Sequence, residues 1–291
     1  MKKKLRTRGH TVVLNRSRGG DAGITVMLVI FGAFMFLPMV YVISQSLKPY
    51  NELFYFPPRF FPEAPTPANF VSLFKLMGDS WVPFSRYIFN TVFVSVLGTF
   101  GNLALGSLAA YALSKINFPG RGGFFAVIQY SLMISPTVTA LTQFILLNAL
   151  GLLDSDFSLI IPAWGSTLGL FLMKQFMDGS ISVPVLESAR LDGASELKIF
   201  WEIAMPMVKP AWLTMIVYSF QGLWNTGTTA FIYSEQYKTL NYAIQQITSA
   251  GVARAGAAAA AVVFMMIVPL LVFVFSQSQI VETMGSSGMK D

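Results

Sequence analysis

After the N-terminal tail, the most charged segment of the chain runs from Val183 to Pro206 and reads VPVLESARLDGASELKIFWEIAMP. Pro184 stands where a helix can begin, because a first helical turn does not need the N–H that proline lacks. Residues 186–191 have the apolar and polar spacing of one and a half turns of amphipathic helix. Gly193 permits a sharp turn, since glycine takes positive φ without penalty. Ser195 indicates a second helix start, so the segment predicts helix, glycine turn, helix.

Long apolar segments precede and follow this region in the sequence. Apolar residues make up 54% of the chain and charged residues only 12%, whereas soluble domains are about one quarter charged. A helix needs roughly 20 apolar residues to cross a bilayer. Six segments meet or approach that length: 24–46, 89–113, 124–147, 157–173, 210–232 and 256–280. The sequence therefore predicts an all-α integral membrane protein with six transmembrane helices.

The distribution of basic residues predicts the topology. With the N-terminus in the cytoplasm, the inside segments are 1–23, 114–123, 174–209 and 281–291, and they hold fourteen of the twenty Lys and Arg residues. The outside segments hold the other six, so the positive-inside rule favours both termini in the cytoplasm. The predicted organisation is a basic tail at 1–23, a transmembrane domain at 24–280 with a cytoplasmic loop at 174–209, and a tail at 281–291.

Several functional classes are disfavoured. The chain has no cysteine and one histidine, His10, which leaves no thiolate metal site and no plausible catalytic constellation. It also lacks the G-x-x-x-x-G-K-[ST] phosphate loop, so any ATP hydrolysis requires another polypeptide. The basic N-terminal tail is better explained as a cytoplasmic segment that sets the membrane topology than as a nucleic-acid-binding segment. The apolar stretch after it is too long for a signal peptide and has no small-residue cleavage site.

The third and fifth segments are more polar than the others. Uncharged polar groups in lipid face protein or a water-filled path, and amides, hydroxyls and aromatic rings suit a neutral, hydroxyl-rich solute. Hydrogen bonds between helices are an equally good explanation. The candidate pathway residues are Gln129, Tyr130, Gln221, Trp224 and Asn225. In the second segment, small residues at spacing four (Gly98, Asn102, Gly106 and Ala110) predict close helix packing.

From composition alone, an ordinary solvated loop is the favoured interpretation of 174–209, and a docking element is the alternative. The loop resembles the EAA loop of ATP-binding-cassette (ABC) importer permeases: Glu-Ala-Ala, three residues, Gly, nine residues, Ile, one residue, Leu-Pro. Here Glu187-Ser188-Ala189 is followed at that spacing by Gly193, Ile203 and Met205-Pro206. Ser188 and Met205 depart from the pattern and are compatible with it in size.

Further motifs look like the carbohydrate branch of that family, the maltose-type second permease subunit. They are Ser46-Leu47-Lys48-Pro49, Asn90-Thr91, Leu108 to Lys115, Phe118-Pro119-Gly120-Arg121, Asp192-Gly193-Ala194-Ser195, Lys209-Pro210 and Trp224-Asn225. The C-terminal residues 287–291 depart from the Gly-x-Val-Lys-Gly-like tail frequent in the family.

The resemblance implies a type I ABC importer permease in a bacterial cell membrane, importing a sugar or oligosaccharide. Its implied partners are a second permease subunit, expected to be a different chain, two cytoplasmic ATPases that bind ATP and Mg, and an extracytoplasmic solute-binding protein. The implied coupling residues are Glu187, Ser188, Ala189, Asp192, Gly193 and Pro206. In this interpretation Glu187 pairs with a basic group on the ATPase, and Gly193 supplies the turn.

Two other functions compete with this one. A stand-alone secondary transporter or channel for a neutral polar solute would usually show ionisable residues within its spans and repeated halves, and neither is evident. A membrane-bound enzyme would need acids, histidines or metal-ligand clusters within the membrane, and the six segments contain none.

Overall fold

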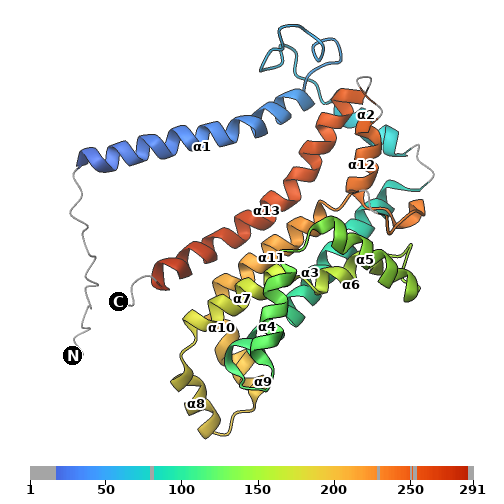
Figure 1. Cartoon of the computed structure of the whole chain (residues 1–291). Helices are drawn as coiled ribbons and strands as arrows, with labels where there is room; N and C mark the ends of the chain where they lie inside the picture. Colours follow the sequence, from blue (N-terminus) through green and yellow to red (C-terminus); the bar gives the residue numbers. More distant parts are fainter. Residues whose placement is uncertain (1–17, 79–81, 228–229, 250, 252–253, 288–291) are drawn as a thin grey trace, which may run out of the picture.

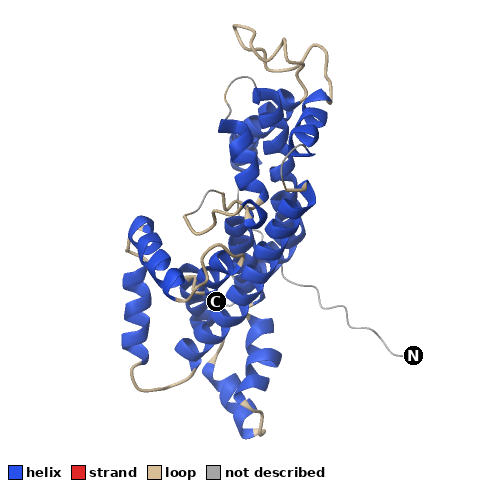
Figure 2. Ribbon diagram, turned by 90° about the vertical axis from the view of Figure 1, so that its right-hand side faces the viewer, coloured by secondary structure: helices blue, strands red, loops and turns tan. Residues whose placement is uncertain are grey.

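The structure is a computed structural model that describes residues 18–78, 82–227, 230–249, 251 and 254–287, and within these residues every regular element is helical (Figures 1 and 2). Residues 1–17 of the predicted basic tail and residues 288–291 lie outside the described part. The elements are α1 (Arg18–Ser46), α2 (Ala68–Gly78), α3 (Phe84–Lys115), α4 (Arg121–Ser131), α5 (Pro136–Ala149), α6 (Phe157–Trp164), α7 (Thr167–Ser180), α8 (Val183–Leu191), α9 (Glu196–Ile199), η1 (Phe200–Ala204), α10 (Met205–Met207), α11 (Lys209–Trp224), η2 (Glu235–Tyr237), α12 (Leu240–Ser249) and α13 (Ala255–Ser287).

Four of the described helical segments are long and apolar enough to cross a membrane: α1, α3, α6 with α7, and α13. Two bent helix pairs bring the number to six if each pair forms one span. The α6–α7 segment extends to Ser180, beyond the Met173 end expected from the apolar run. The expected end was too early because Lys174 is accommodated on the helix, where its ammonium pairs with Asp178 at 2.6 Å.

The third expected span is bent. Helices α4 and α5 meet at 111° across the break between Ser131 and Pro136. Ser135 has an extended backbone, with ψ of 136°. A proline disfavours helical geometry in the residue before it, so helix cannot continue through Ser135. Helix α4 ends at Ser131, and a new helix begins with Pro136 in its first turn. The apolar run at 124–147 is therefore divided at Pro136 into two helices, α4 and α5.

The fifth expected span is shorter than the apolar run at 210–232, because α11 ends at Trp224. Side chains at its end compete for the helix carbonyls: Asn225 Nδ2 donates to Gln221 O at 2.8 Å, and Thr226 Oγ1 donates to Gly222 O at 3.0 Å. The Thr226 carbonyl then accepts from Thr239 Oγ1 at 2.7 Å. This bond holds the segment after α11 against the segment that leads into α12.

Helix α3 is the centre of the bundle and contacts α6, α7 and α11. Its small residues are where the neighbouring helices come closest. A Cβ atom on Gly101 would lie 2.0 Å from Trp164 Nε1, and one on Gly106 would lie 2.5 Å from Met215 Cε. The packing interpretation of this stripe is confirmed.

The motif Asn90-Thr91 fastens α3 to the segment before α12. Asn90 Nδ2 donates to the carbonyl oxygens of Gln236 at 2.7 Å and Lys238 at 3.0 Å. Thr91 Oγ1 accepts from Leu240 N at 2.7 Å. Both side chains are fully buried, so these polar residues serve the packing of one end of the bundle. Helices α8 and α9 lie at the opposite end (Figure 1).

Candidate functional site

The segment 183–206 folds as the predicted helix, turn and helix, which we call the hairpin (α8, Gly193 and α9). Gly193 has φ of +81°. Its N–H donates to Arg190 O at 3.0 Å, and Ala194 N–H donates to Ala189 O at 3.0 Å. These two bonds form a Schellman cap, which requires a residue in the left-handed region at this position. Ser195 then caps α9 by accepting from Lys198 N.

The inner face of the hairpin is anchored in the bundle. Leu186 and Ala189 are buried in one apolar cluster with Met177 of α7, Phe200 of η1 and Met215 of α11. Because these side chains come from several helices, a displacement of α8 must move its neighbours or break the packing. Ala189, a predicted coupling residue, therefore faces the bundle.

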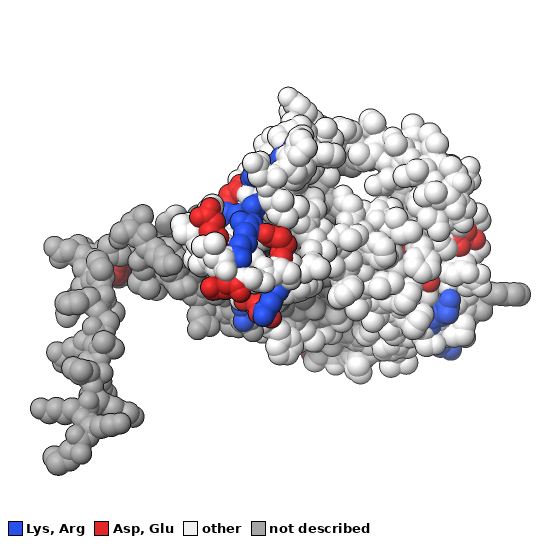
Figure 3. Space-filling view, turned by 90° about the horizontal axis from the view of Figure 1, so that it is seen from below, with Lys and Arg blue, Asp and Glu red and all other residues white. Residues whose placement is uncertain are grey.

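The outer face of the hairpin is exposed. Glu187, Ser188 and Asp192 all point away from the core, and Leu191 and Leu197 are 88% and 64% exposed. Seen from this end of the molecule, most of the Lys, Arg, Asp and Glu side chains in view gather in a patch left of centre, and a smaller group lies near the right-hand edge (Figure 3). Pro206, in α10, is also exposed. Charged groups around exposed leucines are typical of a protein-binding surface.

Glu196 ties the hairpin to α3. Its carboxylate accepts from Arg190 Nε at 2.6 Å and from the Tyr111 hydroxyl at 2.9 Å. The hydrogen bond from Arg190, supported by that from Tyr111 and opposed by partial burial, holds the pKa of Glu196 below its usual value. Tyr111 is buried and packs edge-on against Phe200, with ring centroids 5.4 Å apart. Sequence reasoning did not find this bridge, because Tyr111 and Glu196 are far apart in the chain.

A second candidate site is a groove between α11, α12 and α13, with a volume of about 500 Å³. Its polar lining consists of three amides, Gln221, Asn225 and Asn241, and its apolar lining includes Met265 and Phe273. The Asn241 amide donates to the Asn225 carbonyl and so connects two of the elements. Among the side chains that the structure describes, none that lines this groove is charged.

The structure brings together two of the five predicted pathway residues, Gln221 and Asn225. Trp224 is buried at 3% exposure, and its Nε1 donates to Met265 O at 3.1 Å. Gln129 and Tyr130 lie outside the groove on α4, where Tyr130 is 70% exposed.

Sequence reasoning did not select Asn241, because it lies between the expected spans 210–232 and 256–280, in a segment expected outside the membrane. The signal for α12 was nevertheless present, since its buried residues Leu240, Ala243, Ile244 and Ile247 follow the spacing of one helix face. Within the described residues no group of three or more His, Asp or Glu side chains is placed to hold a metal ion.

Comparison with known proteins identifies the family. Residues 102–284 match the model of the binding-protein-dependent transport system inner membrane component. The chain belongs to this family. It is 31% identical over 228 residues to the polygalacturonan/rhamnogalacturonan transport system permease protein YtcP of Bacillus subtilis, a match that covers 75% of this chain and 73% of the relative. It is 30% identical over 218 residues to the sn-glycerol-3-phosphate transport system permease protein UgpE of Yersinia enterocolitica, covering 73% and 76%.

The fold has a counterpart among solved structures. A bacterial ABC transporter involved in the import of the acidic polysaccharide alginate contains a chain that matches with a TM-score of 0.75 at 25% identity, covering 90% of this chain and 98% of that one. The resemblance to carbohydrate ABC permeases and the type I importer architecture are thus confirmed. The chain is a multi-pass membrane component of a transporter, and the family argues against the stand-alone carrier and enzyme alternatives.

Proposed function

We propose that this permease forms half of the translocation pathway of an ATP-driven importer for a neutral sugar or oligosaccharide, and that the hairpin receives force from a separate ATPase. The observation that carries the proposal is the two-sided character of the hairpin. Leu186 and Ala189 are buried in the bundle, whereas Leu191 and Leu197 are exposed beside Glu187. Burying two exposed leucines against a partner contributes roughly 1.5–3 kcal/mol each.

The direction of the coupling follows from the same contacts. A push on α8 reaches α7 and α11 through the packed side chains of the apolar cluster. It reaches α3 through Glu196, which bonds Tyr111. The Schellman cap at Gly193 keeps α8 and α9 in one fixed geometry, so the hairpin can act as a rigid lever. Glu187, Ser188, Asp192 and Pro206 would contact the ATPase, which would hold ATP and Mg.

The groove supports a neutral solute. Amides donate to and accept from hydroxyl groups equally well. The planar ring of Phe273 and the apolar chain of Met265 suit the apolar faces of a sugar ring. The relatives are named for polygalacturonan, alginate and glycerol-3-phosphate, all anionic. The described lining of the groove in this chain offers no Lys or Arg to such an anion. Gln221, Asn225 and Asn241 would bind the solute, and a second permease, expected to be a different chain, would complete the pathway.

The end opposite the hairpin would receive a solute-binding protein. It carries an open hollow of about 920 Å³ whose lining includes Arg86, Phe89, Glu235 and Gln236. In this orientation the hairpin and both termini are cytoplasmic, in agreement with the excess of Lys and Arg in the loops on that side.

Co-purification and uptake test the proposal together. We would express the permease with its partner permease, ATPase and binding protein, and compare Leu191→Asp with Lys75→Asp, a substitution on α2 at the opposite end. We expect Leu191→Asp to lose ATPase association and uptake, and Lys75→Asp to keep ATPase association. Full association and full uptake in the Leu191→Asp complex would overturn the coupling role of the hairpin.

A further inference from the structure

A pocket of about 460 Å³ lies where α3, α4 and α7 meet, at the hairpin end of the bundle. Its lining is Leu113, Asn117, Phe118, Gly120, Arg121, Gly122, Phe125 and Lys174. These residues belong to the ends of membrane-spanning helices and to the short connection between α3 and α4. The pocket is therefore at the level where the bundle leaves the hydrocarbon region, and it is separate from the amide-lined groove of α11–α13.

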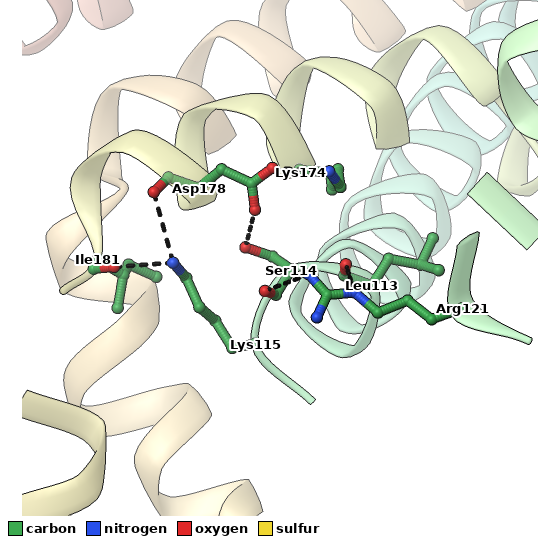
Figure 4. Close-up of polar contacts among 7 residues, drawn as sticks. All are labelled: Leu113, Ser114, Lys115, Arg121, Lys174, Asp178 and Ile181. Carbon is green, nitrogen blue, oxygen red and sulfur yellow. Dashed lines mark hydrogen bonds and ion pairs between the residues drawn. The ribbon is translucent and has the colours of Figure 1, made fainter. Parts of the chain in front are cut away.

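The charge around this pocket is unbalanced. Lys115 and Lys174 lie next to Asp178, the one carboxylate drawn in this part of the described structure, and Arg121 lies beyond Ser114 (Figure 4). Asp178 pairs with Lys174 at 2.6 Å and accepts from Ser114 Oγ at 2.6 Å. Three cations and one carboxylate leave two positive charges without a carboxylate partner.

Lys115 and Arg121 are held by backbone carbonyls. Arg121 donates to Leu113 O and Ser114 O, both at 2.7 Å, and Lys115 Nζ donates to Ile181 O at 2.8 Å (Figure 4). Carbonyl groups fix the position of these cations but do not neutralise their charge. The described ion pairs of the protein include neither Lys115 nor Arg121. Arg121 and Lys174 line the pocket, with Lys115 next to them in the chain or in space, so the pocket is a preorganised site for an anion.

The aromatic and apolar side chains beside the pocket favour a ligand that also has an apolar part. Lys174 Nζ lies 4.0 Å from the centroid of the Phe125 ring, which stacks on Phe171 at 5.9 Å. Helix α4, which begins at Arg121, has no buried residue. Its Phe124 and Val127 are 64% and 67% exposed. A free phosphate would use the cations alone, whereas an anionic phospholipid would use the cations and the apolar face of α4.

We propose that this pocket binds the phosphate headgroup of an anionic phospholipid, with its acyl chains along α4. The inference rests on the orientation in the proposed function, which puts the pocket in the cytoplasmic leaflet. Basic pockets between spans on that side suit anionic headgroups. The lipid would join α4 to α3 and α7 next to the start of the hairpin.

The test uses a substitution that leaves the cation network intact. Gly122 lines the pocket, and a Cβ atom there would meet nothing within 4 Å. Gly122→Glu places a negative charge in the first turn of α4, where acidic residues are tolerated, and Gly122→Gln has the same shape without the charge. Native mass spectrometry of the purified full transporter would count phosphatidylglycerol retained by each variant, with phosphatidylcholine as the neutral lipid.

We expect the wild type and Gly122→Gln to retain phosphatidylglycerol in preference to phosphatidylcholine, and Gly122→Glu to bind it about fivefold more weakly. Lys198→Gln, which removes an exposed cation of the hairpin, should leave retention unchanged. Equal retention by the Glu and Gln variants, or no preference for the anionic lipid, would overturn the proposal. So would displacement of the signal by inorganic phosphate, because the ligand would then be a soluble anion.

The outcome is independent of the coupling proposal. Lipid retention is measured without ATP or solute. A permease that fails to bind an ATPase can therefore still retain the lipid. Conversely, a functional importer without a bound anionic lipid would refute the pocket assignment and leave the hairpin proposal intact.

Discussion

The Tyr111 hydroxyl donates to the Glu196 carboxylate at 2.9 Å and joins the central helix α3 to the second helix of the hairpin. Glu196 also accepts from Arg190 of the first hairpin helix at 2.6 Å. One carboxylate thus connects both arms of the hairpin to α3. In the proposed function, this bridge is one route by which movement of the hairpin reaches the pathway.

Removing one oxygen atom, that of the Tyr111 hydroxyl, breaks the hydrogen bond between α3 and the hairpin. Tyr111→Phe keeps the ring against Phe200 and removes the hydroxyl, which should cost about 1 kcal/mol of stability. We expect more ATP hydrolysed per solute imported, because α3 follows the hairpin less closely. Uptake and ATPase rates in proteoliposomes measure this ratio. Tyr218→Phe, at an exposed tyrosine, is the control, and an unchanged ratio in Tyr111→Phe would exclude a coupling role for the bridge.

The pH dependence of the bridge has a definite sign. Because Arg190 and Tyr111 hold the pKa of Glu196 below its usual value, the stabilisation is complete above the unfolded pKa of about 4.3 and is lost as pH falls through the lower folded pKa. Glu196→Gln should therefore lower the Tm near pH 7 and have little effect well below pH 4. Thermal unfolding at a series of pH values tests this, and a Tm difference that grows on acidification would contradict it.

Gly193 is constrained by its backbone alone. Its φ is +81°, and a Cβ atom would meet nothing within 4 Å. Gly193→Ala should therefore strain the cap by about 1–2 kcal/mol and weaken ATPase association. Gly179→Ala in α7 is the control: a Cβ atom there also meets nothing within 4 Å, but Gly179 does not have a positive φ. This substitution should leave stability unchanged or raise it slightly. Pull-down of the ATPase by both variants checks the prediction; equal association would show that the turn geometry is dispensable.

Gly101 is constrained by its neighbour. A Cβ atom there would lie 2.0 Å from Trp164 Nε1, so Gly101→Ala must displace the indole ring, and overpacking of this kind costs typically 1–3 kcal/mol. Gly222→Ala on α11 has open space around the new methyl group. Thermal unfolding in detergent should show a lower Tm for Gly101→Ala only. A Tm equal to that of the wild type would mean that α3 and α6 are not closely packed here.

The groove and the polar face of α4 are two alternative locations for the solute-binding site. Gln221 lines the groove, whereas Gln129 lies on α4 outside it. Gln221→Leu should raise the KM for solute by about twofold to tenfold, the value of one hydrogen bond, without changing ATPase association. Gln129→Leu should leave KM unchanged if the groove is the binding site. The reverse pattern would move the pathway to α4.

The sequence determined those features that depend on neighbouring residues. Apolar length located six segments, of which four correspond to single long helices and one, 124–147, to the bent pair of α4 and α5. The spacing from Glu187 to Pro206 predicted the hairpin, and the need for positive φ at Gly193 is a local property of the backbone. These predictions succeed because hydrophobic length and backbone conformation require no knowledge of distant contacts.

The tertiary structure decided what depends on distant partners. Asn90 meets Lys238 across 148 positions, and Tyr111 meets Glu196 across 85. The position of the chain just after α11 depends on Thr239, whose Oγ1 donates to the Thr226 carbonyl 13 positions away. A polar side chain in an apolar run has the same local sequence whether it faces a solute, another helix or lipid. Only the packed bundle supplies its partner, and for that reason Trp224 is now seen in the core while Gln221 and Asn225 line the groove.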